Sequence, residues 1–473
     1  MAEKISFPPI KNGMYREAAI DQALIPQDSL AFSMNMHNDV IGAMTLRKGM
    51  TALGTQLTAS TPILGMHFYR NNAGSTFASI AKIGTTVKAY SGSSWANIRT
   101  GITAGSKARF TNLVDYTFMV NGTGNEVLQT WSGSGSMGTT NDGDLPKGDC
   151  IENYRNRIWV AQATLDKVFY TDVVNTDNTI SGGTGFLQIS PNDGEKIRGL
   201  KRHPRALLVF KENHIYRIFN VNNADPDPSI MRGTYSQESI IESKRGIHYH
   251  HPSGFYDFVF DGEQKEISRP IIDIIQSITR ANYDNIAGWA EDDALCWSVG
   301  DITLGGIAFT NVVCRYTLST EVWTVYSTAS EIRSASFYDD GSNGVFNLVG
   351  DDNGYVMKWG VGTTDNGSPI FYDLQTQWMT LTQLRTTSKT LSTIVSLHEN
   401  AQGGNLSYKL DTDPLSKWRP IGDLARDLYQ IDSLNAKDFY RIKFRLSGNS
   451  SGSPFNFRGF EALDLVIGSE VRK

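Results

Sequence analysis

Three histidines stand close together in 248-HYHHP-252, and their spacing is the first feature of this chain that could support chemistry. On a β-strand His248 and His250 share a face, so a zinc or nickel pair is sterically possible there, with His251 beside it. A structural metal site needs four ligands, and no further ligand with matching spacing is visible. We therefore expect strand and loop imidazoles packed beside aromatic residues, with no metal and no cofactor.

Carboxylates gather in four short acidic clusters. Paired carboxylates of different pKa would serve glycoside hydrolysis, and alternating Asp and Asn would bind calcium. Here the carboxylates stand beside Gly and Asn, where turn geometry selects them. The chain also lacks a Gly-x-Ser-x-Gly elbow and a phosphate-binding glycine loop. We therefore expect that the protein is not an enzyme. The clusters are 223-NADPDPS-229, 291-EDD-293, 339-DDGSNG-344 and 350-GDDNG-354.

Two basic segments could contact DNA phosphates or pair with acidic residues of a neighbouring subunit. The formal net charge of −5 argues against a protein that coats nucleic acid, because such a protein would be basic. We expect these side chains at a subunit interface or along a DNA channel, and favour the interface. They are Lys196, Arg198, Lys201, Arg202 and Arg205 in the first segment, and Lys244 and Arg245 in the second.

The elements that must position these side chains are short strands joined by tight polar turns. Strand–turn–strand phrases recur roughly every 40 to 50 residues, the period of β-propeller blades. A blade buries its faces only against its neighbours, so the architecture requires repetition. The pattern predicts an all-β propeller of about seven blades, with six to eight possible. The phrases are 77–91, 117–131, 157–172, 207–218, 256–267, 294–309 and 345–360, and 311–327 is a further strand–turn–strand segment.

Other features limit the class of protein further. Only 270-PIIDIIQSIT-279 shows good helical periodicity. No run of about 18 apolar residues exists, so we expect no membrane segment. Cys150, Cys296 and Cys314 have no metal or redox spacing, and we expect buried thiols and synthesis in a reducing cytoplasm.

The chain divides into three parts in this reading. Residues 1–62 form an N-terminal extended arm with a strand that completes a sheet, 63–365 form the propeller, and 366–473 form a C-terminal β-sandwich. In 440-YRIKFRLSG-448 apolar and basic residues alternate, which marks a strand with one buried and one wet face. The Gly- and Ser-rich segment 132–146 and the insertion 173–186 are expected to be projecting loops.

Several phrases at the two ends resemble those of bacteriophage tail and neck propeller proteins, in particular the nozzle or tail-hub proteins of short-tailed phages and the packaged-DNA-stabilising protein. The phrases are 26-PQDSLAFSMNMHNDVIGAMTLRKGMTALG-54, 392-STIVSLHE-399, 416-SKWRPIG-422, 439-FYRIKFRLSG-448 and 454-PFNFRGFEALDL-465.

This resemblance implies a virion structural protein that is made in the host cytoplasm and placed in the tail or neck. It implies a homo-oligomeric ring of six copies around the DNA channel. Such a ring would retain the packaged genome and conduct viral DNA during ejection. Its partners would be an adaptor, a portal-proximal ring or tail fibres. Loops 132–146 and 173–186, with the histidine segment, would be candidates for gating or docking.

A second interpretation is a carbohydrate-binding or depolymerase-type propeller that acts in receptor recognition. A pocket with two opposed carboxylates and stacked aromatic rings would favour it. A narrow central tunnel filled by side chains from the inner strands would disfavour it. A cellular scaffold propeller is a weaker third interpretation, because it gives no obvious use to the two end segments.

Overall fold

The computed structural model describes residues 3–6, 10–16, 25–40, 42–139, 147–173, 185–221, 223–225, 232–339, 341, 344–382, 386–400, 404–414, 417–424, 428–452 and 455–467. Nearly all regular structure in these residues is β-strand, arranged in many small antiparallel sheets. The all-β prediction is confirmed. Helical structure in the described residues is limited to α1 (Ile272–Ser277) and three short 3-10 turns, η1 (Gln237–Ser239), η2 (Arg269–Ile271) and η3 (Arg280–Asn285).

Seven four-stranded antiparallel units follow one another in the described part of the chain; six are separate sheets, and the unit β26–β29 belongs to a nine-stranded sheet. The first two are β6 (Ile63–Arg70), β7 (Phe77–Ile83), β8 (Thr86–Tyr90), β9 (Trp95–Thr100), then β10 (Arg109–Leu113), β11 (Tyr116–Val120), β12 (Gln129–Trp131), β13 (Gly138–Thr139). The next two are β14 (Cys150–Tyr154), β15 (Arg157–Gln162), β16 (Lys167–Tyr170), β17 (Gly185–Gln188), then β18 (Ile197–Arg202), β19 (Leu207–Lys211), β20 (Ile215–Asn220), β21 (Asn223–Asp225).

The remaining three units complete the set. They are β22 (Ile241–Ser243), β23 (Gly246–His251), β24 (Gly254–Asp257), β25 (Lys265–Glu266), then β26 (Ala287–Ala290), β27 (Ala294–Leu304), β28 (Ile307–Thr317), β29 (Val322–Ser327), then β30 (Ile332–Asp339), β31 (Val345–Asp351), β32 (Val356–Trp359) and β5 (Met50–Ala52). Each of the seven predicted strand–turn–strand phrases forms an antiparallel pair in a different unit. The segment 311–327 pairs as β28 with β29, as predicted.

Tight turns explain why these hairpins close. Gly305 and Gly306 both have positive φ and join β27 to β28 in a two-residue turn. Arg155 and Asn156 do the same between β14 and β15. Turns of this kind match the right-handed twist of paired strands, and glycine or asparagine adopts them at little cost.

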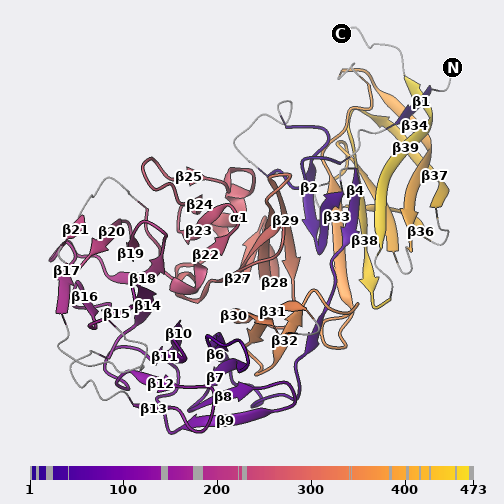
Figure 1. The fold of residues 1–473 in the computed structure, drawn as a ribbon. Helices are drawn as coiled ribbons and strands as arrows, with labels where there is room; N and C mark the ends of the chain where they lie inside the picture. The colour runs from indigo at the N-terminus through magenta and orange to yellow at the C-terminus, as the bar shows by residue number, and fades with distance from the viewer. Residues whose placement is uncertain are drawn as a thin grey trace.

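The seven units lie around a common centre in a propeller-like arrangement (Figure 1). Each neighbouring pair shares an apolar core. One core joins the β6–β9 and β10–β13 units, and others follow in turn around the set. The last core joins the β30–β32 unit back to the β6–β9 unit, and β30 contacts β6 directly. First strands of neighbouring units contact one another, as β6 contacts β10, β10 contacts β14 and β14 contacts β18.

The predicted helix is confirmed as the turn η2 followed by α1. Ile271, Ile274, Ile275 and Ile278 are buried on one side of it, in the core shared with β27 and β28. The isoleucine spacing in the sequence therefore reports a packed helical face.

The described strands among the N-terminal 62 residues belong to two different parts of the molecule. β5 is the fourth strand of the β30–β32 unit, where Met50 pairs with Trp359. The preceding strands β1 (Glu3–Ser6), β2 (Leu30–Met34), β3 (Met36–Val40) and β4 (Ala43–Leu46) join sheets near the C-terminus. The expectation that a strand of this segment completes a sheet is confirmed.

The C-terminal part packs two sheets face to face around one large core. One sheet has the order β3-β4-β39-β34-β37, with β1 also paired to β39. The other runs β2-β33-β38-β35-β36 and continues without a break into β29 of the propeller-like part, making a nine-stranded sheet. The C-terminal strands are β33 (Ile370–Thr376), β34 (Lys389–Glu399), β35 (Gly404–Leu410), β36 (Arg419–Leu424), β37 (Leu428–Phe439), β38 (Ile442–Ser450) and β39 (Asn456–Ile467).

A buried ionic network holds the junction of the two parts. Arg47 donates to Asp365 through Nη1 at 2.8 Å and to Asn35 Oδ1 through Nε at 2.8 Å. A second terminal nitrogen of Arg47 donates to the carbonyl of Ser327, at the end of β29. Asn35 in turn donates to the carbonyl of Phe371 in β33. One arginine therefore ties together the N-terminal segment, a propeller-like unit and the sandwich.

Candidate functional site

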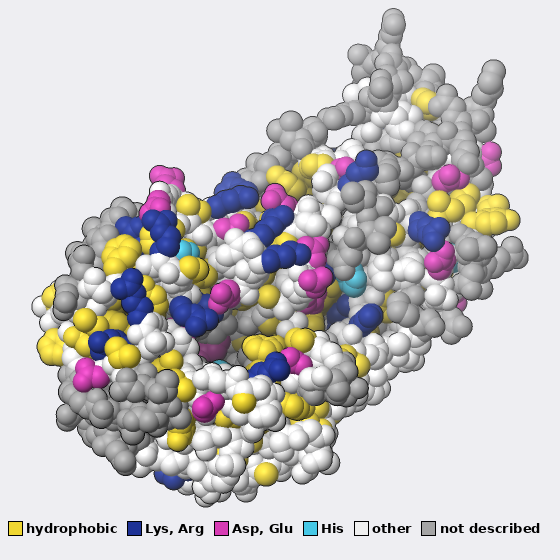
Figure 2. Space-filling model, in the orientation of Figure 1, with side chains coloured by type: hydrophobic (Ala, Val, Ile, Leu, Met, Phe, Trp, Pro, Cys, Tyr) yellow, Lys and Arg dark blue, Asp and Glu magenta, His cyan; other side chains and the backbone are white. Residues whose placement is uncertain are grey.

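Three charged side chains meet where the first strands of the units converge. Lys107 and Arg109 lie at the start of β10, and Glu238 lies on the turn η1. This turn contacts β18 and β26, so it brings Glu238 toward the centre of the ring of sheets. Figure 2 shows that the visible face is hollowed at this centre. The three side chains are called the axial cluster below.

The axial cluster is a close ion-pair network. Arg109 grips Glu238 with two nitrogens, Nε to Oε1 at 2.7 Å and Nη2 to Oε2 at 3.1 Å. Lys107 Nζ lies 3.2 Å from Glu238 Oε2. Each cation also donates to a backbone carbonyl, Lys107 to that of Asp284 and Arg109 to that of Asp149. All three side chains are largely buried, so the network has few contacts to water.

Burial and charge set the protonation of this cluster. Burial by itself would raise the pKa of the Glu238 carboxyl, but the charges of Arg109 and Lys107 hold it well below its usual range. For Lys107, burial lowers the pKa more than Glu238 raises it. Burial raises the pKa of the neighbouring Cys150 thiol to about 12, so this thiol stays protonated. The carboxylate is therefore the fixed charge around which the two cations are organised.

The axial cluster separates two cavities. One, of about 390 Å³, is lined by Lys107 and Arg109, and the other, of about 540 Å³, by Arg109 and Glu238. Arg109 lines both. The larger cavity also receives residues from the first strands β6, β10, β14, β18, β26 and β30. Among the described residues, the axial cluster therefore borders both cavities.

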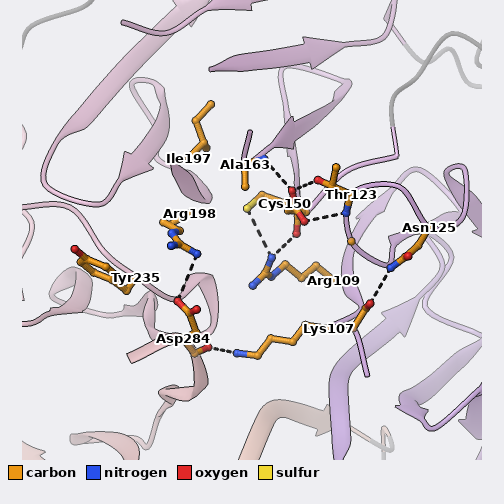
Figure 3. Close-up of a pocket in the computed structure, with 13 residues that line it drawn as sticks. Lys107, Arg109, Thr123, Asn125, Cys150, Ala163, Ile197, Arg198, Tyr235 and Asp284 are labelled. Carbon is orange, nitrogen blue, oxygen red and sulfur yellow. Dashed lines mark hydrogen bonds and ion pairs between the residues drawn. The ribbon is translucent and has the colours of Figure 1, made fainter. Parts of the chain in front are cut away.

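The smaller cavity is polar (Figure 3). Lys107 and Arg109, at the start of β10, and Arg198 of β18 point into the same space, with Tyr235 beside them. Asp149 closes the opposite side, where it accepts hydrogen bonds from the backbone N–H groups of Thr123 at 2.9 Å and Ala163 at 2.8 Å. Its carboxylate is used to hold two loops, so it is a structural group.

Of the seven basic residues predicted from the sequence, three line the axial cavities and four do not. Arg198 lines the smaller cavity, and Lys201 and Arg202 line the larger one. Lys196, Arg205, Lys244 and Arg245 line neither of these two cavities.

Most of these side chains pair with acids of the same chain, a partner that the sequence analysis did not consider. The ion pairs are Arg198–Glu212 at 2.6 Å, Lys201–Glu242 at 2.9 Å, Arg205–Asp261 at 2.7 Å, Lys244–Asp293 at 3.4 Å and Arg245–Glu321 at 3.5 Å. Arg202 Nη1 donates to Asn153 Oδ1 at 3.1 Å. The roles in a DNA channel or a subunit interface stay predictions.

The sequence analysis missed the axial cluster. The sequence analysis assigned no role to Lys107, Arg109 or Glu238. The available signal was a pair of cations that flanks the start of an apolar strand. Such a pair is unusual on a strand that must face the crowded centre of a propeller.

The three histidines do not share one environment. His250 is fully buried between the rings of Phe255 and Tyr283, and burial lowers its pKa to about 3. Burial also lowers the pKa of His251 to about 4, and its ring contacts Ser253. In the described part of the chain, no three His, Cys, Asp or Glu side chains lie close enough together to hold a metal ion.

His248 forms a hydrogen-bonded series across three strands. Its Nε2 lies 2.8 Å from Ser243 Oγ in β22, and its Nδ1 lies 2.6 Å from Asp257 Oδ1 in β24. This order of groups is also that of an acyl-transfer triad. However, the His248 ring is only 1% exposed, and Ser243 Oγ already accepts from the backbone N–H of Arg245. The series therefore fixes the β22–β23 turn.

Replacing His248 by alanine should lower the free energy of unfolding by about 1–3 kcal/mol, because Ser243 and Asp257 lose a buried partner. Urea denaturation measures this change, and His251→Ala should have a smaller effect because His251 is only partly buried. A fluorophosphonate probe should leave Ser243 unlabelled. Labelling that depends on Asp257 would contradict the structural role.

The three cysteines are free and buried, as predicted. Burial raises the pKa of the Cys314 thiol to about 12, and that of Cys296 well above its usual range. Among the described residues, no helix combines the length and apolar character needed to cross a membrane. Of the predicted loops at 132–146 and 173–186, residues 140–146 and 174–184 lie outside the described residues. The described remainder includes β13 and the first two residues of β17.

Comparisons with known proteins leave the family open. No family model matches the chain, and no curated protein matches it. Among solved structures, the chain is similar to the extracellular domain of a putative one-component system from B. thetaiotaomicron, with 11% identity and a TM-score of 0.44. That match covers 89% of this chain and 62% of the other, so the chain spans less than two thirds of that relative.

A second similar structure is BBS1N in complex with ARL6DN, with 9% identity and a TM-score of 0.38, over 68% of this chain and 99% of the other. At such identities and scores, neither likeness supports a conclusion about function.

Proposed function

We propose that this chain is a virion structural protein of a bacteriophage tail or neck, without enzymatic activity. In this proposal the seven units form a closed seven-bladed propeller, and copies of the chain assemble into a ring around the DNA channel. The ring has six copies, retains the packaged genome and conducts it during ejection. Its other partners are an adaptor, a portal-proximal ring or tail fibres.

The unbroken series of cores around the seven units supports the closed propeller, because each unit buries both faces against neighbours. β5 precedes the first unit in the chain but pairs with β32 of the last unit. This pairing would hold the first and last units of a closed propeller together. The axial cluster lies at the centre of one chain and borders two cavities of only about 390 and 540 Å³. A DNA passage would therefore have to lie between copies.

One observation supports the assembly of copies into a ring: an open strand edge with exposed apolar side chains. β37 ends its sheet and pairs only with β34 among the described strands. On it Tyr429 is 60% exposed and Ile431 58% exposed. Figure 2 shows hydrophobic side chains gathered where Figure 1 places β37. Monomeric proteins usually protect such edges, so a neighbouring copy is the expected cover.

The proposal predicts a defined ring in solution. Mass photometry and negative-stain images of the purified chain should show six-fold rings with an axial hole, whose interfaces each bury about 2,000 Å² or more. The variant Ile431→Arg should shift the chain toward the monomer, because a charge would be desolvated at the contact. Lys437→Ala, an exposed control on the same strand, should assemble normally. A monomer at every concentration would contradict the ring.

The alternative function, carbohydrate binding in receptor recognition, has a specific observation in its favour. The larger axial cavity is lined by two carboxylates, Glu238 and Glu152, but Glu238 is ion-paired with two cations. Glu152 accepts hydrogen bonds from Thr111 Oγ1 and from a backbone N–H group, so both carboxylates already have structural partners. A separate groove, however, combines aromatic rings with polar groups. This favours binding without hydrolysis.

A further inference from the structure

A groove of about 670 Å³ lies where the propeller-like part meets the sandwich. Its floor is the continuous nine-stranded sheet, with side chains from β2, β33, β38 and β35. The tip of the β27–β28 hairpin forms one wall, including Ile307, which is 63% exposed. Trp378 and Trp418 line it as well. This groove, called the junction groove below, forms where the two parts share one sheet, as the neighbouring strands β29, β2 and β33 in Figure 1 show.

Positive charge exceeds negative charge in this junction groove. Four cations line it, Arg16, Lys409, Lys443 and Arg445, and Asp373 is the lining carboxylate. Arg445 already grips Asp373 with two contacts of 2.9 Å. Arg16 pairs at 2.7 Å with Asp273 of α1.

The two lysines oppose each other directly. Lys409 of β35 and Lys443 of β38 are cross-strand partners in the sheet register. Like charges in this position destabilise a sheet. The side chain of Lys443 makes no hydrogen bond or ion pair with any residue that the structure describes, whereas its backbone pairs within the sheet. Burial, followed by the charges of Arg16 and Lys409, lowers the pKa of Lys443 to about 8. An anion placed here would relieve this repulsion.

Aromatic rings give the junction groove a second recognition element. Trp418 lies beneath two of the cations, with Lys409 at 6.0 Å and Arg445 at 5.8 Å from its ring centroid. Trp378, Phe309 and Phe371 complete the apolar surface. A flat apolar face next to cations suits a ligand that has both an apolar face and an anionic group.

We propose that the junction groove binds a sugar that carries a carboxylate or a phosphate group. The anionic group contacts Lys443, with Lys409 and Arg445 nearby, and the sugar ring stacks on Trp418 or Trp378. The amide of Gln375 and the hydroxyl of Thr310 line the same groove and suit sugar hydroxyl groups. This site does not depend on ring assembly, and it gives the chain a role in contacting acidic glycans.

Calorimetric titration of the full chain tests the site with named probes: D-glucuronate, glucose 6-phosphate, neutral D-glucose and dAMP. We expect at least one anionic sugar to bind at least tenfold more tightly than glucose. Preference for glucuronate identifies a carboxylated sugar, and preference for glucose 6-phosphate a phosphorylated one. Equal binding of glucose, no binding at all, or tighter binding of dAMP would overturn the proposal.

Variants separate the site from general charge effects. Lys443→Gln should weaken the anionic sugar at least tenfold, Lys443→Arg should largely restore it, and Trp418→Ala should weaken glucose and glucuronate alike. Lys437→Gln, an exposed lysine on the opposite sheet, is the matched control and should bind normally. A Lys443→Gln chain that melts normally and binds normally would refute the assignment, and it would leave the ring proposal untouched.

Affinity should also fall severalfold between pH 7 and pH 9, because Lys443 loses its proton near pH 8. The charged groups that face it are Arg16, Lys409, Arg445 and Asp373. In Lys443→Arg this loss of affinity should be much smaller, since arginine stays charged. An identical pH profile in the two chains would count against Lys443 as the anion contact.

Discussion

Replacing Glu238 by alanine should lower the free energy of unfolding by about 3–5 kcal/mol, among the largest effects of any single substitution in this chain. Removing the carboxylate leaves Lys107 and Arg109 buried against each other without their counter-charge. Urea denaturation followed by tryptophan fluorescence measures the change. Glu238→Gln should be nearly as damaging, because it also leaves the two buried cations without a counter-charge. Since glutamine keeps the shape of glutamate, this variant reports the effect of the charge alone.

A matched control lies on the next strand. Glu242 pairs with Lys201, but its side chain is 55% exposed. Glu242→Gln should therefore cost less than about 1 kcal/mol. Similar small effects at Glu238 and Glu242 would mean that the axial cluster is solvated, and that the centre of the propeller-like part is open to water.

The axial cluster also predicts how stability depends on pH. The pKa of Glu238 is lower in the folded chain than its ordinary value of 4.5. Its contribution is therefore fully present above about pH 4.5 and is lost as the pH falls toward the folded value. Between pH 5 and pH 3 the wild-type chain should lose more stability than Glu238→Gln does.

Replacing Arg47 by methionine should cost a similar amount, about 3–5 kcal/mol, because Asp365 would stay buried without a partner. Methionine keeps most of the volume, so the loss reports the charge and the hydrogen bonds. Because Arg47 joins the two parts of the molecule, limited proteolysis between β32 and β33 should also become faster.

Arg70→Met provides the control for this second substitution. Arg70 also pairs with an aspartate, Asp339, at 3.1 Å, but the arginine is 48% exposed. We expect a change below about 1 kcal/mol and no effect on proteolysis. If Arg47→Met unfolded at the same urea concentration as Arg70→Met, the junction network would not be what holds the two parts together.

The local elements of this protein are predictable from its sequence. Each predicted hairpin joins apolar strands through a turn of Gly, Asn or Asp, and these preferences act over a few residues. The isoleucines of 270–279 likewise mark a helical face by spacing alone. The burial of Cys150, Cys296 and Cys314 follows from their apolar neighbours. These features need no knowledge of where the rest of the chain lies.

Contacts between distant segments were decided by the tertiary structure. Arg47 meets Asp365 across 318 positions, and Arg109 meets Glu238 across 129. The junction groove needs a strand from residues 30–34 to lie between β29 and β33. Electrostatic pairing depends on separation in space and on burial, and no local pattern encodes either quantity. For that reason the sequence determined the hairpins, the helix and the buried thiols, and folding decided which charges became partners and which grooves exist.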